Sequence, residues 1–171
     1  GYQADCDYGG NTLCIEVADE DKFIIVDAGS GLTKVHPREV KEYHIIFSHL
    51  HWDHIHSLNF FVPMFAPGTD INLYGVHNEL EASVRTLLNG TNFPIKFEDV
   101  PSNIKFHKLE KYKKKIINSF EVTPFELDHP GRAYGYCIEK GGKKVATVFD
   151  SEFTRAGEKF LGDDSKYYDN L

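Results

Sequence analysis

Cysteine is scarce in this sequence: three occur in 171 residues, at Cys6, Cys14 and Cys137. An odd number of widely spaced cysteines does not form a disulfide framework and fits a reducing compartment. No apolar run approaches the ~20 residues that a membrane span needs, and the first residues lack the basic and apolar regions of a signal peptide. We therefore expect a cytoplasmic protein with no membrane partner.

Basic residues are few relative to acidic ones. The 19 lysines and arginines stand against 26 aspartates and glutamates, and the formal net charge is −7. This balance argues against a surface built for indiscriminate binding, so a nucleic-acid partner is disfavoured. It does not exclude phosphate chemistry, because divalent cations would reverse the field inside a cleft. A lysine cluster at 111–115 fits a solvated turn.

Internal repeats and low-complexity segments are absent from the sequence. Its hydrophobic content of 41% and aromatic content of 13% are those of a globular protein. The length predicts a single domain over residues 1–171, with enough chain for a substantial core.

Short β-prone runs and helical patterns alternate along the first half of the chain. Residues 12–17 and 23–26 flank an acidic turn and predict a hairpin. The elements expected next are a strand at 44–47, a helix from 55 limited by Pro63 and Pro67, a strand at 71–74 and a helix at 78–89 capped by Asn78.

The second half is mostly β-prone. Runs are expected at 104–109, 120–127, 134–139 and 143–149, followed by a helix at 155–161. Lys140-Gly141-Gly142 between the last two runs is a strong hairpin signal. Strands and helices in this order suggest a layered α/β or α+β sandwich.

The densest chemical signal is the segment 48–54, Ser-His-Leu-His-Trp-Asp-His, directly after an apolar run. Imidazole and carboxylate together are the ligand set that suits zinc and its first-row neighbours. Because alternate side chains of an extended segment share a face, His49 and His51 can converge on one metal. Asp53 and His54 follow where the chain turns and can face a second metal, so one short loop could bind two ions.

This loop resembles that of the metallo-β-lactamase-fold hydrolases, and its sequence from Phe47 to Ile55 is most similar to that of their phosphodiesterase and ribonuclease Z-like branch. Further segments resemble family motifs in the family's order. They are the strand-end turn 27–31, the third-histidine motif 127–130 and the bridging-aspartate motif 149–152. The resemblance implies an αββα sandwich, two sheets face to face with helices outside and metals at one edge.

The resemblance also implies a ligand set. His49, His51 and His129 would bind one metal, Asp53 and His54 the other, and Asp150 would bridge them. Asp53 is in addition the candidate catalytic residue. The expected cofactors are two divalent ions, zinc first, with manganese or iron as alternatives. Asp27 is either a plain turn former or a support for the metal loop.

The function that follows is a metal-dependent hydrolase. Hydroxide held by the metals would attack a small phosphodiester such as a cyclic nucleotide, and no protein nucleophile is needed. The alternatives are a thioester or lactone hydrolase, a ribonuclease Z-like nuclease, and a truncated metal-binding or interaction domain without catalysis. The charge balance and the lack of a long glycine- and lysine-rich insertion disfavour the nuclease.

Relative to the family pattern, the chain lacks an N-terminal strand and the C-terminal segment with the last histidine. We therefore expect a sandwich incomplete at both ends, a second metal site short of one ligand, and an exposed strand edge that favours a homodimer. Trp52 is expected to pack as a wedge. His77 is expected either to line the cleft or to cap a turn, and His56 to point away from the site.

Overall fold

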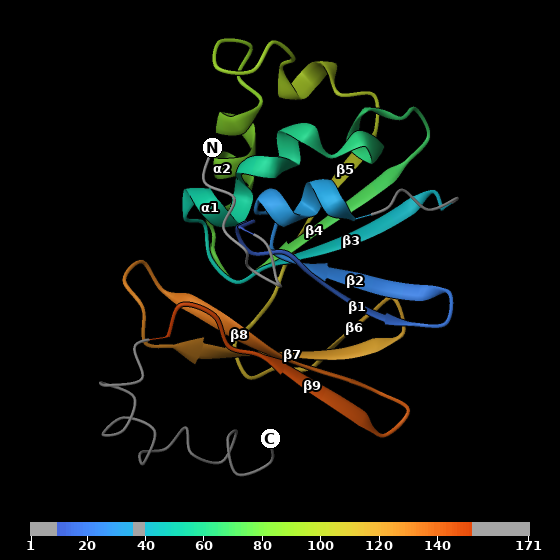
Figure 1. Cartoon of the computed structure of the whole chain (residues 1–171), viewed down its shortest axis with the longest axis vertical. Coiled ribbons are helices and arrows are strands. Elements are labelled where there is room, and N and C mark those ends of the chain that lie inside the picture. The colour runs from blue at the N-terminus through green and yellow to red at the C-terminus, as the bar shows by residue number, and fades with distance from the viewer. Residues whose placement is uncertain (1–9, 36–39, 152–171) are drawn as a thin grey trace.

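Two β-sheets pack face to face in the computed structural model, which describes residues 10–35 and 40–151 (Figure 1). The first sheet has five strands in the order β1-β2-β3-β4-β5, and the second has four in the order β6-β7-β8-β9. Helical segments cover the face of the first sheet that points away from the second (Figure 1). The predicted sandwich of two sheets is therefore confirmed.

In the first sheet an antiparallel hairpin leads into parallel strands. Its strands are β1 Ile15–Asp19, β2 Lys22–Val26, β3 Glu42–Phe47, β4 Asp70–Gly75 and β5 Asn103–Lys108. The second sheet is antiparallel throughout. Its strands are β6 Lys115–Ile117, β7 Phe120–Leu127, β8 Ala133–Lys140 and β9 Lys143–Thr147. Because β2 and β3 are parallel, their carboxyl ends meet at one edge of the sandwich.

Strand β2 shows why this sequence makes a layered fold. Phe23 and Ile25 belong to the core cluster under the helices, whereas Ile24 and Val26 belong to the cluster between the sheets. Alternate side chains of a strand point to opposite faces, so a strand buried on both faces is apolar throughout. All four of these side chains are at most 2% exposed.

The helical layer consists of short segments: η1 Ser30–Lys34, α1 Trp52–Ile55, η2 His56–Phe60, η3 Val62–Phe65, α2 Leu80–Leu87 and η4 Phe97–Asp99. The helix expected from residue 55 is wrong: the single α-turn ends at Ile55, and two 3₁₀ turns follow it, with Pro63 inside the second. Proline lacks the N–H that an α-helix would need at that position. The helix expected at 155–161 lies outside the described residues.

Both predicted hairpins are confirmed, and Gly141 and Gly142 have the positive φ angles, +59° and +76°, that a tight type I′ turn requires. The predicted cap of the second helix is wrong. Helix α2 begins after Glu79, and the Asn78 side chain accepts a hydrogen bond from Lys108 Nζ at 2.6 Å instead.

Strands β1 and β9 are the outer strands on one side of the sandwich, and each pairs with a single neighbour among the described strands. Pairing of such an edge with a second copy stays a prediction. Within the described residues, no helix is long and apolar enough to cross a bilayer.

Tyr136 joins the two sheets at the end of β3. Its side chain is fully buried, and its hydroxyl donates to the Phe47 carbonyl at 2.6 Å. Replacing Tyr136 by phenylalanine leaves that carbonyl without this donor inside the core. We expect Tyr136→Phe to lower the free energy of unfolding by about 1–3 kcal/mol, measured by urea denaturation. An unchanged midpoint and slope would show that this contact contributes nothing.

Candidate metal centre

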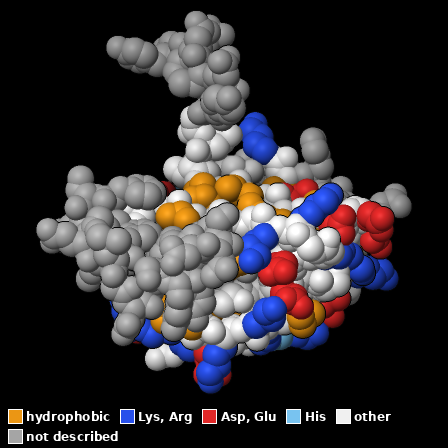
Figure 2. Space-filling model, turned by 90° about the horizontal axis from the view of Figure 1, so that it is seen from below, with side chains coloured by type: hydrophobic (Ala, Val, Ile, Leu, Met, Phe, Trp, Pro, Cys, Tyr) orange, Lys and Arg blue, Asp and Glu red, His pale blue; other side chains and the backbone are white. Residues whose placement is uncertain are grey.

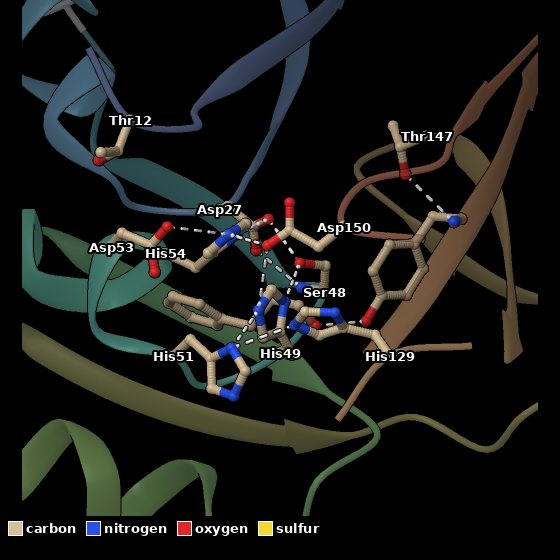
Figure 3. Close-up of polar contacts among 12 residues, drawn as sticks. Thr12, Asp27, Ser48, His49, His51, Asp53, His54, His129, Thr147 and Asp150 are labelled. Carbon is tan, nitrogen blue, oxygen red and sulfur yellow. Dashed lines mark hydrogen bonds and ion pairs between the residues drawn. The ribbon is translucent and has the colours of Figure 1, made fainter. Parts of the chain in front are cut away.

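Three segments that are far apart in the sequence meet at the edge where β2 and β3 end (Figure 3). After β3, the loop carries His49 and His51, and the short helix α1 that follows carries His54. The turn between β7 and β8 carries His129, and the segment after β9 carries Asp150. Both sheets therefore contribute side chains to one cluster.

The first group of side chains contains three histidines. The Nε2 atom of His49 lies 3.0 Å from Nδ1 of His51, and Nε2 of His129 lies 3.2 Å from the same atom. Each residue offers one ring nitrogen, and these nitrogens lie within 4.8 Å of one another. These are the three residues expected to hold one metal.

The second group contains His49, His54 and Asp150, again within 4.8 Å. The Nε2 atom of His54 lies 2.9 Å from Oδ2 of Asp150, and Nε2 of His49 lies 3.5 Å from the same oxygen. His49 is the residue shared by both groups, and Asp150 belongs to the second group alone, so its bridging role stays a prediction. Asp53 belongs to neither group: its carboxylate is 3.6 Å from His54 Nε2 and its side chain is 55% exposed.

The buried Asp27 carboxylate is hydrogen-bonded to the segment after β3 that carries the histidines. It accepts hydrogen bonds from the Ser48 backbone N–H at 2.7 Å, from the Ser48 hydroxyl at 2.6 Å and from His54 Nδ1 at 2.9 Å. Asp27 directly follows β2 with a left-handed backbone, φ +64°, which aspartate tolerates better than most residues. Asp27 is therefore a turn residue and a support of the loop at once.

These hydrogen bonds fix which ring nitrogens face the cluster. The single Ser48 hydroxyl hydrogen goes to Asp27, so Ser48 Oγ accepts from Nδ1 of His49, 3.0 Å away. His54 likewise donates through Nδ1 to Asp27. Nε2 is then the free ring nitrogen of His49 and, when its ring is neutral, of His54, at 3.5 Å and 2.9 Å from Oδ2 of Asp150. Metal-binding histidines are usually held in this way, with the other ring nitrogen donating to a neighbouring group.

The electrostatic setting differs between the two histidines. Burial, followed by the neighbouring His54 and His51, lowers the pKa of His49 to about 3, so its ring is neutral. Burial also lowers the pKa of His54, but the hydrogen bond and charge of Asp27 and the charge of Asp150 raise it on balance. Burial raises the pKa of Asp27, opposed by its hydrogen bonds to His54 and Ser48.

The residues present fit a divalent cation. Nε2 of His54 and a carboxylate oxygen of Asp150 are 2.9 Å apart, so either a proton or a cation must lie near both atoms. In the first group, nitrogen separations of 3.0 and 3.2 Å are close to the ~3.3 Å between ligands of a tetrahedral zinc with Zn–N bonds of about 2.0–2.1 Å. The cluster could therefore bind a metal, although the metal role of each residue stays a prediction.

Gly29 explains the close approach of the β2 turn to the loop. A Cβ atom at this position would lie 2.4 Å from the Asp53 carbonyl oxygen and 2.5 Å from the Leu13 carbonyl oxygen. The Ala28 N–H donates to the His54 carbonyl at 2.7 Å just beside it. Only glycine lets the two backbones come this near.

Of the other residues near the centre, His56 points away from both ligand groups as expected, whereas Trp52 does not lie where the sequence placed it. Trp52 is 62% exposed, so the expectation that it packs as a wedge is wrong. His56 stacks on it and bonds the Trp52 carbonyl, away from both ligand groups. Ser48 was missed because a serine before a histidine carries no pattern of its own.

The lysine cluster at 111–115 is largely paired with acidic side chains. Lys111 pairs with Glu126 at 2.9 Å, Lys113 with Glu110 at 2.5 Å, and Lys114 with Glu121. Figure 2 shows basic and acidic side chains interspersed on the face seen from below the second sheet. This pairing agrees with the interpretation of the cluster as a solvated turn.

The chain belongs to the β-lactamase superfamily, because the model of the Beta-lactamase superfamily domain matches residues 22–162. Members of this family are metal-dependent hydrolases, among them nucleases and phosphodiesterases. The resemblance inferred from the motifs is thereby confirmed.

Two curated relatives are ribonucleases. The chain is 30% identical to Ribonuclease BN of Salmonella paratyphi C (strain RKS4594) over 135 residues, 71% of this chain and 40% of the relative. It is 26% identical to Ribonuclease Z of Staphylococcus carnosus (strain TM300) over 103 residues, 56% of this chain and 31% of the relative. The chain thus spans less than half of either relative.

Solved structures confirm the fold. Human tRNase Z, short form, matches with a TM-score of 0.61 at 15% identity, covering 87% of this chain and 67% of that one. The metallo-β-lactamase fold protein YhfI of Bacillus subtilis matches with a TM-score of 0.60 at 20% identity, covering 79% and 53%. Yeast PDE1 matches with a TM-score of 0.56 at 15% identity, covering 79% and 59%.

Loss of His129 tests the first ligand group. We expect His129→Ala to weaken zinc binding by more than the roughly 10–100-fold that loss of a ligand's hydrogen-bond partner costs, because a ligand itself is removed. Competition with a chromophoric chelator measures the affinity. The control is His56→Ala, since His56 is in neither ligand group. Equal affinities of the two variants would refute the assignment of His129.

Proposed function

We propose that this protein is a metal-dependent phosphodiester hydrolase whose centre is the cluster at the ends of β2 and β3. The observation that carries the proposal is the convergence of five of the six candidate ligands, from both sheets, into two overlapping groups. Membership of a family of metal-dependent hydrolases supports it.

We propose further that each group holds one divalent ion, with zinc the first candidate and manganese or iron the alternatives. Neutral imidazole and carboxylate suit all three metals. Such ions supply positive charge for the non-bridging oxygens of the substrate and lower the pKa of a nearby water. The protein holds the ligand rings in place through Asp27 and Ser48.

Asp53 is the proposed acid–base group. Its carboxylate is the exposed acidic group beside the cluster, 3.6 Å from His54 Nε2, and it lies outside both ligand groups. Oδ2 of Asp53 can therefore take a proton from a water molecule that approaches from solvent. Exposure keeps this carboxylate free to exchange that proton with bulk water.

The proposed substrate is a small phosphodiester, such as a cyclic nucleotide. The two curated relatives named as ribonucleases support phosphodiester chemistry and favour RNA as the second candidate. Against RNA stand the net charge of −7 and the pairing of the lysine cluster with glutamates.

A substrate panel tests the proposal. We expect the protein with zinc or manganese to hydrolyse bis-para-nitrophenyl phosphate and a cyclic nucleotide faster than a short RNA, a thioester or a lactone. Removal of the metal by a chelator should abolish turnover, and its return should restore turnover. Product release, followed by absorbance or chromatography, measures the rates.

The other outcomes each point elsewhere. Preferential cleavage of RNA would assign the nuclease function, and preferential hydrolysis of the thioester or lactone would assign acyl chemistry. Zinc bound at the cluster without turnover of any substrate would leave a domain that binds metal without catalysis.

Asp53→Asn tests the acid–base role. The amide cannot accept the proton, so we expect kcat to fall roughly 100- to 10,000-fold while the zinc content is retained. Asp21→Asn, in the turn between β1 and β2, is the matched control and should keep full activity. Loss of one metal from Asp53→Asn would make Asp53 a ligand instead, and an unchanged kcat would remove it from the reaction.

A further inference from the structure

His77 contacts the turn that carries His129 and belongs to neither ligand group. It follows β4, at the same edge of the first sheet as the loop after β3. The residue is 8% exposed, and its ring meets the Tyr134 ring edge-on, with centroids 5.2 Å apart. The ring is therefore packed against β8 of the second sheet and is nearly closed off from solvent.

The one ring atom of His77 with a hydrogen-bond partner is Nε2, which lies 2.5 Å from the carbonyl oxygen of Arg132. A carbonyl only accepts, so Nε2 carries the hydrogen and donates it. Nδ1 is buried and has no partner within the described part of the chain. A phenylalanine or leucine would fill the same space without a buried unsatisfied nitrogen, so packing alone does not account for histidine here.

Arg132 closes the turn that carries His129. Its N–H donates to the His129 carbonyl at 3.3 Å, and its backbone is left-handed, φ +64°, directly after Gly131 at +83°. A left-handed backbone is unfavourable for arginine, so the turn needs contacts that hold it. The bond from His77 is such a contact.

The turn bears directly on the first ligand group. A Cβ atom added to Gly131 would lie 3.2 Å from Nε2 of His51, so the turn packs against that ring. After the turn, the Tyr134 N–H donates to the Ser48 carbonyl at 2.9 Å. The turn is thus fixed to the loop after β3 on one side and to the loop after β4 on the other.

We infer that His77 is a positioning residue: by holding the Arg132 carbonyl it sets where His129 lies relative to His49 and His51. This inference rests on the proposed function, because it assumes a metal at the first ligand group. His77 acts through the turn and touches none of the three ligands' ring nitrogens in the contacts described above.

Two variants of the full chain separate positioning from packing. His77→Phe fills the space but cannot donate, whereas the side-chain amide of His77→Gln can donate to the Arg132 carbonyl. We expect His77→Phe to bind zinc at least tenfold more weakly than the unaltered protein and His77→Gln to recover most of that loss. The visible spectrum of the cobalt-loaded protein, which reports the ligand geometry, should shift in His77→Phe and return in His77→Gln.

His44→Phe is the matched control. His44 is 7% exposed on β3, bonds the Tyr74 hydroxyl at 3.0 Å and belongs to neither ligand group. We expect it to lose thermal stability without a change in zinc affinity or in the cobalt spectrum. Thermal unfolding of the metal-free proteins shows whether each variant folds.

The outcomes are distinguishable. The positioning role alone is overturned if His77→Phe leaves the zinc affinity and the cobalt spectrum unchanged. It is also overturned if His77→Gln does not recover the zinc affinity that His77→Phe loses. Equal weakening in His44→Phe overturns it as well, because the effect is then one of general stability. If His129→Ala binds zinc as tightly as the unaltered protein does, both this inference and the proposed function are overturned.

Discussion

The whole centre depends on one buried carboxylate. Asp27 is fully buried, and its two oxygens accept hydrogen bonds from the backbone and hydroxyl of Ser48 and from the His54 ring. Burying a charge is costly unless it is well hydrogen-bonded, and here the hydrogen-bond partners belong to the segment after β3 that carries the candidate ligands. The conformation of the loop after β3 is therefore tied to the hydrogen bonds that stabilise the buried Asp27 carboxylate.

The order of the elements along the chain explains how this arrangement arises. The apolar strands β2 and β3 are buried on both faces and run parallel, so their ends are fixed side by side. Asp27 and Ser48 each follow one of these ends, which places the carboxylate against the loop. The second sheet then adds His129 and Asp150 from a turn and a strand end, and Tyr136 joins the sheets beneath them.

Much of this could be predicted because it rests on local signals. The continuous apolar runs gave β2 and β3, the glycine pair gave the β8–β9 hairpin, and the histidine spacing together with the family motifs gave the candidate ligands. What failed depended on contacts distant in the chain. Asn78 had the pattern of a cap, but Lys108 from β5 draws its side chain away. Trp52 had the size of a core residue, yet no element covers it within the described part.

His54 and Asp150 are separated by 96 positions along the chain, yet their facing atoms are 2.9 Å apart. An ion held by both would act as a reversible cross-link that closes a very long loop, and the entropic constraint of such a closure grows only slowly with loop length. Ligation and assembly of the two sheets are then thermodynamically linked. An ion that binds only the assembled cluster would therefore shift the folding equilibrium toward the folded state.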